Sequence, residues 1–245
     1  MAQITVTVAD GNRSAHVTGG RIDLETGDLR YPARFPHRPG LFRVHSLADE
    51  LTLIQGLNRA TGQNVGVYVE LKHPRWHRDQ GFDIAADVIG LLHAHGYRDK
   101  DARAFIQCFD AAELRRIKSR DLTRLPLIQL IGENRWWPEA KTDFDFLRTP
   151  AGLKQVSTYA VGIGPWYRQI LLDTNSDGEI RFSALVENAH AAGLMVHPYT
   201  LRADALPDIL PDFDRLLDFL IRQQKVDGVF TDHPDRVKQF LAREE

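Results

Sequence analysis

The alternation of short apolar runs with amphipathic stretches from residue 64 onward constrains the fold of this chain more than any other feature. A short apolar run bounded by polar residues predicts a buried strand, and apolar residues at helical spacing predict a helix. Strands that alternate with helices are typical of βα units around a parallel sheet. The apolar runs cover 64–72, 103–110, 125–131, 159–164, 193–200 and 226–232. We therefore expect an α/β fold with about six βα units.

The stretches around these runs predict helices. Apolar residues recur at helical spacing over 47–57, 82–95, 111–118, 182–192 and 213–223. Ser46 and Asp110 precede two of these stretches, and both residue types cap helix N-termini.

The first 45 residues follow a different pattern. Ile4, Val6 and Val8 alternate with polar residues, and glycines and prolines break the segment into short pieces. We interpret 1–45 as an irregular, β-rich excursion with antiparallel pairing, and 46–245 as the run of βα units.

A complete TIM (β/α)8 barrel has about 250 residues, which the 245 residues of the chain nearly match. Six units are nevertheless two short of a closed barrel of eight strands. We therefore expect a partial TIM (β/α)8 barrel. The open edges of such a sheet carry unpaired backbone groups, so we also expect self-association through those edges unless 1–45 covers the gap.

Composition excludes several classes of protein. The balance of 31 Lys and Arg against 33 Asp and Glu argues against a nucleic-acid-binding surface. No apolar stretch approaches the ~18 residues that span a bilayer. Residues 1–20 lack the pattern of a secretory signal, so the chain as given is expected in the cytoplasm. Cys108 is the one cysteine, which excludes an intrachain disulfide and favours a buried apolar role.

The carboxyl ends of the strands are where βα folds place functional side chains. Glu70 and Lys72 are two residues apart at such an end, so alternation places them on one face of their strand. An acid and a base at the mouth of a barrel could hold a divalent cation and a phosphate oxygen. An ion pair without a ligand is the alternative, and the pattern alone leaves both open.

Three histidines are further candidates. His73 and His77 have the i, i+4 spacing of a metal pair, but Pro74 argues against a continuous helix, so packing at the mouth is preferred. His197 ends a strand, where it could contact a substrate or bond to backbone.

Two further segments admit two interpretations each. Residues 173–178 match the first half of an EF-hand loop, but Ala184 holds the twelfth position, which favours a surface turn over a calcium site. The aromatic residues of a long βα loop could bind substrate or pack, and packing is slightly preferred; they are Trp136, Trp137, Phe144 and Phe146.

Several segments together carry a resemblance to a known family. They are YPARFPHRPGLFRVHSLADE (31–50), VYVELKHPRWH (67–77), QCFDAAELRRIKS (107–119), LPLIQLIGE (125–133), YAVGIGPWY (159–167), MVHPYTLRADALP (195–207) and GVFTDHPDRVKQFL (228–241). In these segments the chain resembles the glycerophosphodiester phosphodiesterase family, and more closely its periplasmic bacterial branch.

The resemblance implies an enzyme of lipid and glycerol metabolism, a phosphoric diester hydrolase on a TIM barrel. Such an enzyme hydrolyses glycerophosphodiesters, its small-molecule substrates, to glycerol 3-phosphate and an alcohol with a divalent metal, Ca²⁺ or Mg²⁺. The resemblance also implies that Glu70 is a metal ligand and that Lys72 binds the phosphate. It places Gln107 and Phe109 at the mouth, and Tyr199 near the glycerol moiety.

The family's His-Arg-Gly and Glu-x-Asp segments do not occur in this sequence. They supply the catalytic histidine pair and two metal carboxylates, so we assign no catalytic residue. We expect the carboxyl-terminal part of a larger barrel with impaired activity, and prefer a translation start placed too far downstream over a specialised half-barrel. The alternative is a non-catalytic fragment that binds a phosphodiester or glycerol phosphate. A full-length member with a signal would be periplasmic.

Overall fold

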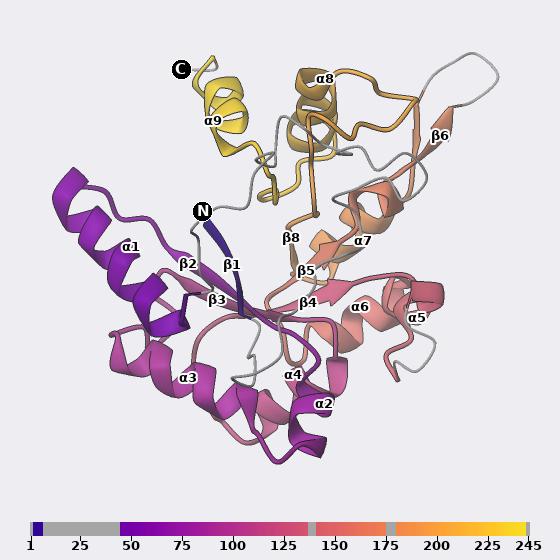
Figure 1. The fold of residues 1–245 in the computed structure, drawn as a ribbon. Coiled ribbons are helices and arrows are strands. Elements are labelled where there is room, and N and C mark those ends of the chain that lie inside the picture. Colours follow the sequence, from indigo (N-terminus) through magenta and orange to yellow (C-terminus); the bar gives the residue numbers. More distant parts are fainter. Residues whose placement is uncertain (1, 7–44, 137–140, 175–179, 244–245) are drawn as a thin grey trace, which may run out of the picture.

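A parallel sheet of six strands lies at the centre of the protein, in a computed structural model that describes residues 2–6, 45–136, 141–174 and 180–243. The strand order is β1-β2-β3-β4-β5-β8, and the pairings between these neighbours are parallel (Figure 1). The strands are β1 (Ala2–Val6), β2 (Val67–Leu71), β3 (Ala104–Cys108), β4 (Leu127–Ile131), β5 (Gly162–Pro165) and β8 (Met195–Val196). The expected α/β fold with a parallel sheet is confirmed.

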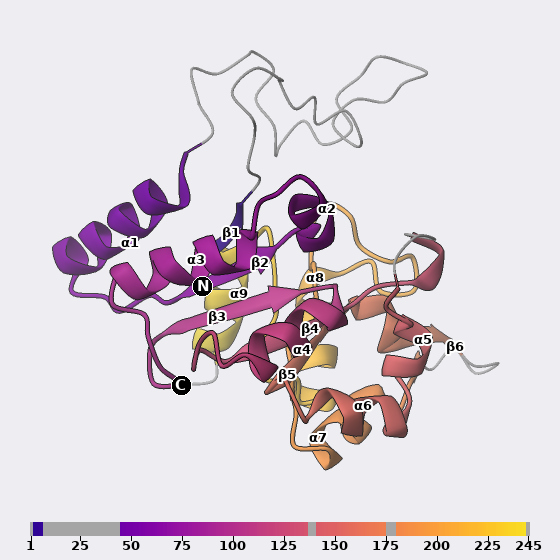
Figure 2. The same ribbon diagram turned by 90° about the horizontal axis from the view of Figure 1, so that it is seen from below.

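Helices follow the strands and cover the outer side of the sheet. In Figures 1 and 2, α3, α4, α6 and α7 succeed one another around that side. The helices are α1 (Leu47–Thr61), α2 (Pro74–Asp79), α3 (Ile84–Ala94), α4 (Ala111–Ser119), α5 (Phe144–Leu147), α6 (Pro150–Val156), α7 (Leu185–Ala191), α8 (Phe213–Leu217) and α9 (Pro234–Ala242). A π-helical segment, Asp218–Gln223, continues α8, and 3-10 helices occupy Asn134–Trp136 and Tyr167–Gln169.

Two of the helix starts follow from the capping residues in the sequence. The Ser46 side chain accepts a hydrogen bond from the Asp49 amide at the start of α1. At α4, the Asp110 carboxylate accepts from the amides of Ala112 and Glu113. Both side chains satisfy amides that the first helical turn leaves unpaired.

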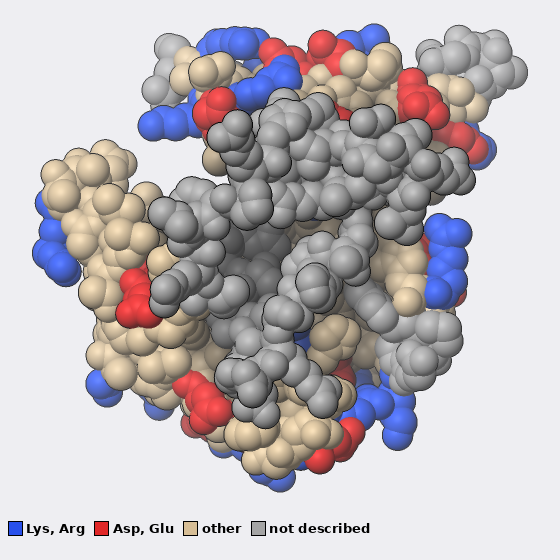
Figure 3. Space-filling view, viewed as in Figure 1, with Lys and Arg blue, Asp and Glu red and all other residues tan. Residues whose placement is uncertain are grey.

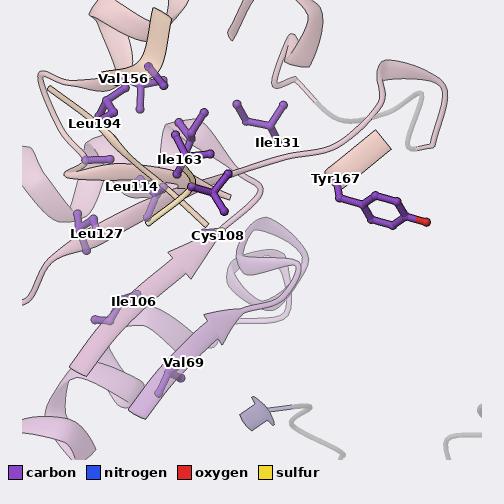
Figure 4. Packing of buried hydrophobic residues seen from close by; sticks show 14 of the residues in the cluster. Val69, Ile106, Cys108, Leu114, Leu127, Ile131, Val156, Ile163, Tyr167 and Leu194 are labelled. Carbon is purple, nitrogen blue, oxygen red and sulfur yellow. The ribbon is translucent and has the colours of Figure 1, made fainter. Parts of the chain in front are cut away.

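Strand alternation divides the buried side chains between two clusters. Val69, Ile106 and Ile163 belong to the large cluster between the sheet and the helices, part of which Figure 4 shows. Tyr68 and Ile128 point to the other face, where they form a smaller cluster with Phe230. The second face is the one that a barrel would enclose, because neighbouring residues of a strand point to opposite sides of the sheet.

The last apolar run forms less regular structure than expected. Segment 226–232 lies beside β8 and its continuation, and the Phe230 amide donates to the Pro198 carbonyl at 2.9 Å. Its only bridge to that continuation joins Thr231 to Leu201. Pro198 has no amide hydrogen, which explains why a continuous ladder does not form there.

Two other expectations were wrong in detail. Ala2–Val6 pairs in parallel with β2, whereas antiparallel pairing was expected; an alternating pattern fits one strand but does not encode the direction of its partner. The rest of the expected excursion, 7–44, lies outside the described residues. Phe182 ends β7 (Ile180–Phe182), which pairs with β6 (Leu171–Thr174) in a hairpin, so α7 begins three residues later than the periodicity predicted.

The sheet remains open in the part of the chain that the structure describes. The pairings do not join β1 to segment 226–232, so the edges do not meet. This arrangement agrees with the expected partial barrel. Over the same residues, none of the helices has the length and apolar character that crossing a membrane requires.

Candidate functional site

A pocket of about 290 Å³ opens where β2 and β3 end. This is the edge of a parallel sheet at which βα folds place their binding sites. The pocket is lined by Glu70, Leu71, Lys72, His73, Pro74, Arg75, Trp76, Cys108, Phe109, Asp110, Lys141, Thr142 and Phe144. The pocket therefore combines the predicted residues Glu70, Lys72 and Phe109 with the loop that precedes α5.

Glu70 and Lys72 lie on one face of their strand, as alternation predicted. Nζ of Lys72 is 3.9 Å from Oε2 of Glu70, and the lysine side chain is 41% exposed whereas that of Glu70 is 8% exposed. Burial raises the pKa of the Glu70 carboxyl, and the positive charge of Lys72 opposes that shift. A buried carboxylate whose positive neighbour is 3.9 Å away is suited to bind a second positive group.

The rim of the pocket carries more positive than negative charge. Lys72, Arg75 and Lys141 line it together with Glu70 and Asp110. Asp110 is already engaged, because it caps α4 and lies 3.5 Å from Nη2 of Arg75. An anion such as a phosphate group would therefore find unneutralised positive charge at this rim. Over the face seen in Figure 3, by contrast, acidic and basic side chains are interspersed.

Pro74 was expected to argue against a continuous helix over His73 and His77. A helix does form, but it begins at Pro74, so His77 lies inside it and His73 lies outside. Pro74 is the first residue of α2, a position where a helix tolerates proline because its missing amide hydrogen would be unpaired anyway. His73 precedes it with a left-handed backbone, φ 47° and ψ 49°, and its exposed side chain lines the pocket. His77 is buried inside the helix, and its pKa is lowered by burial and by His73.

Gln107 lies beneath the pocket and does not line it. Its backbone is the register partner of Glu70 across β2 and β3, and the residue is 1% exposed. Within the described residues, its Oε1 atom has no hydrogen-bond partner. A substrate contact by Gln107 thus stays a prediction.

Aromatic rings support one wall of the site. The Phe109 ring lies edge-on to Phe144 and to Tyr199, with centroid distances of 6.1 Å and 5.7 Å. The Tyr199 hydroxyl donates to the Ile131 carbonyl at 2.8 Å. Tyr199 therefore stands behind Phe109, outside the lining of the pocket, and a contact with glycerol stays a prediction.

The other loop aromatics differ in their surroundings. Trp136 lies edge-on to Trp166 at 5.1 Å between ring centroids, whereas Phe146 is 41% exposed. Trp137 lies outside the described residues. Phe144 is buried and also lines the pocket, whereas Trp136 is 36% exposed beside Trp166.

His197 has a partner that the sequence did not indicate. Its Nδ1 lies 3.0 Å from the hydroxyl oxygen of Tyr68, in the buried cluster that also contains Phe230. Burial lowers the pKa of His197, and the nearby Asp227 carboxylate opposes that shift. This imidazole therefore helps to fill the sheet interior.

Two weaker candidates are occupied by structural contacts. Asp173 receives two hydrogen bonds from Arg181, at 2.5 Å and 2.7 Å. Residues 175–179 lie outside the described residues, so the surface turn stays a prediction. The Cys108 thiol is fully buried, donates to the Leu71 carbonyl at 3.2 Å, and has its pKa raised by burial.

Glu70 and Gln107 carry oxygen donors that suit a hard cation. Calcium and magnesium bind oxygen ligands, and Glu70 with the unpartnered Gln107 Oε1 offers a carboxylate and a neutral carbonyl from neighbouring strands. In the described ranges, no cluster contains three or more His, Cys, Asp and Glu side chains arranged around a metal. The fit therefore rests on these two oxygen-bearing side chains.

Several pocket residues were not among the predicted site residues. Arg75 and Asp110 stand in segments that carry the resemblance, so that resemblance offered a signal for them. Lys141 and Thr142 come from a loop without periodicity. The Thr142 hydroxyl accepts from the Ala111 amide at 3.1 Å, which fixes this loop against the start of α4.

Comparisons with known proteins agree with the geometry. A Haemophilus influenzae glycerophosphodiester phosphodiesterase is 36% identical over 225 residues, which are 86% of this chain and 62% of that protein. A Treponema pallidum glycerophosphodiester phosphodiesterase is 32% identical over 228 residues, 87% of this chain and 64% of that protein. The chain thus spans less than two thirds of the length of these relatives.

One solved structure has a fold similar to that of this chain. The crystal structure of a Silicibacter pomeroyi protein, described as a glycerophosphoryl diester phosphodiesterase, matches the structure of this chain with a TM-score of 0.56 and 23% sequence identity. The match covers 89% of this chain and 65% of that one. The model of the glycerophosphoryl diester phosphodiesterase family matches residues 10–236. The chain therefore belongs to the glycerophosphoryl diester phosphodiesterase family.

Proposed function

We propose that this chain acts in the hydrolysis of glycerophosphodiesters to glycerol 3-phosphate and an alcohol, and that the pocket at the ends of β2 and β3 binds the phosphodiester. The observation that carries this proposal is the combination, in one pocket, of the buried carboxylate of Glu70 with the cationic rim of Lys72, Arg75 and Lys141. Hydrolysis of a phosphodiester requires positive charge on the oxygens that become more negative in the transition state.

Lys72 has the central role in binding the phosphate. Its side chain is half exposed and contacts Glu70 only at 3.9 Å, so its ammonium group is free to turn toward a ligand. Arg75 is held by Asp110 and would contribute from a fixed position. Phe109 forms an apolar wall beside them, which suits the carbon skeleton of a glycerol or alcohol group.

A divalent cation, Ca²⁺ or Mg²⁺, is part of the proposal. Glu70 is the residue that would hold it, because its carboxylate is buried and receives no hydrogen bond within the described residues. When bound, such an ion would withdraw negative charge from the phosphate oxygens.

We also propose that turnover by this chain alone is low. Diester hydrolysis needs a base for the attacking water and an acid for the leaving alkoxide. Among the described pocket residues, His73 supplies the one imidazole, since His77 is buried in α2 and His197 is bonded to Tyr68. This observation favours the second candidate function, binding of the phosphodiester without its cleavage.

A hydrolysis assay with glycerophosphocholine and CaCl2 tests the proposal together with calorimetric titration of glycerol 3-phosphate. We expect binding that Lys72→Ala weakens, whereas the matched control Lys100→Ala leaves it unchanged, because the Lys100 side chain is 81% exposed and pairs with Asp101. Absence of both turnover and binding would refute the proposed function. Turnover equal to that of an intact relative would refute the proposed impairment.

A further inference from the structure

The side chains of Glu70 and Gln107 occupy one row of the sheet. They are register partners on β2 and β3, and residues paired in this way project from the same face of a sheet. Glu70 lines the pocket, as do Lys72 and Phe109, which follow Glu70 and Gln107 by two positions along the chain. The side chains of Glu70 and Gln107 are therefore neighbours at the inner end of the pocket.

Gln107 differs from the other buried glutamines of the described chain. Gln129 Oε1 accepts a hydrogen bond from the Tyr159 hydroxyl at 2.9 Å, and Gln169 Oε1 accepts from the Trp166 amide at 3.1 Å. Gln107 is as deeply buried, but its Oε1 accepts from none of the described residues. A buried acceptor without a partner is costly, so an unpaired oxygen of this kind indicates a ligand or a bound water.

We infer that Gln107 is a cation ligand, whose Oε1 binds a calcium ion beside Glu70. This inference rests on the proposed function and extends it, since the resemblance gave Gln107 a place at the mouth rather than a metal bond. Calcium accepts neutral carbonyl oxygens together with carboxylates in flexible geometry, whereas magnesium keeps most of its water ligands. A glutamine carbonyl one strand away from Glu70 therefore favours calcium over magnesium.

The inference predicts opposite effects of one substitution in the two states of the site. Without calcium, Gln107→Leu removes an unpaired buried acceptor, so the melting temperature should rise or stay unchanged. With calcium, the same substitution removes a ligand, so calcium affinity should fall at least about tenfold. Gln107→Glu keeps an oxygen at the position and should retain calcium binding.

The experiment is a calorimetric titration of the whole chain with CaCl2 and, separately, MgCl2, combined with thermal unfolding in EDTA. Gln129→Leu is the matched control: it removes satisfied hydrogen bonds, so it should lower the melting temperature in EDTA but leave calcium affinity unchanged. We expect Gln107→Leu to lower the calcium affinity without lowering the melting temperature in EDTA. The same substitution should affect magnesium binding less than calcium binding.

Three results would overturn the inference. Calcium affinity of Gln107→Leu equal to that of the unsubstituted chain would refute the metal bond and leave the proposed function intact. A lower melting temperature of Gln107→Leu in EDTA would mean that the amide has a protein partner. Absence of calcium binding by the unsubstituted chain would remove the cation altogether, whereas the glycerol 3-phosphate titration would still judge the proposed function.

Discussion

The hydrogen bond between Tyr68 and His197 joins β2 to the residue that follows β8, across the face that a barrel would enclose. The two residues are 129 positions apart in the chain, and their bonded atoms are 3.0 Å apart. Tyr68→Phe removes the hydroxyl but keeps the ring, whose centroid lies 4.8 Å from those of Phe105 and Phe230. The substitution therefore leaves the packing in place and the Nδ1 atom of His197 without its partner.

The expected cost follows from the burial of this pair. Tyr68 is 2% exposed and His197 is 8% exposed, so water cannot readily replace the lost hydroxyl. Leaving a buried polar atom unpaired costs about 1–3 kcal/mol. A loss of about 2 kcal/mol lowers the melting temperature of a chain of this size by roughly 4–8 °C.

Urea denaturation near neutral pH measures this loss. We expect a lower midpoint with an unchanged m-value, because the surface exposed on unfolding is the same. Tyr97→Phe is the matched control, since the half-buried Tyr97 has no hydroxyl hydrogen bond in the described structure. A loss below about 0.5 kcal/mol for Tyr68→Phe, or one equal to that of the control, would refute the reasoning.

Three further predictions concern stability. Burial lowers the pKa of His197 in the folded chain from 6.5, so the unfolded chain takes up a proton on this imidazole at a higher pH than the folded chain does. The free energy of unfolding should therefore decrease as the pH drops below about 6.5. His197→Gln should flatten that decrease in urea unfolding between about pH 7 and pH 5, and an unchanged slope would contradict the prediction. Glu113 is fully buried and forms ion pairs with Arg78 and Arg116. Glu113→Gln should therefore lower the free energy of unfolding by about 3–5 kcal/mol in the same assay. A loss below about 1 kcal/mol would show that stability does not depend on these ion pairs. A Cβ atom at Gly152 would collide with the Phe146 carbonyl oxygen, so Gly152→Ala should lower the melting temperature by several degrees. An unchanged melting temperature would mean that α5 and α6 can move apart to make room for the methyl group.

The local pattern of the sequence predicted most elements of the fold. The runs at 64–72, 103–110, 125–131 and 159–164 became β2 to β5, and Ser46 and Asp110 cap helices as expected. These features depend on residues close in sequence, so periodicity and capping were sufficient. The direction of Ala2–Val6 was predicted wrongly and the helix that begins at Pro74 was not expected, because the first depends on a distant partner and the second on the position of proline within its helix.

The candidate site shows the same division. Strand alternation alone placed Glu70 and Lys72 on one face, and the segments that resemble the family predicted the chemistry proposed for them. Only the tertiary structure shows that Gln107 lies beside Glu70 and that, among the described residues, its Oε1 atom has no hydrogen-bond partner. It also shows that Tyr199 lies behind Phe109. The hydrogen bond of His197 to Tyr68 likewise appears only in the tertiary structure. Strand register and burial arise from packing between segments far apart in the chain, and a sequence pattern that repeats every two or about 3.6 residues carries no information about such contacts.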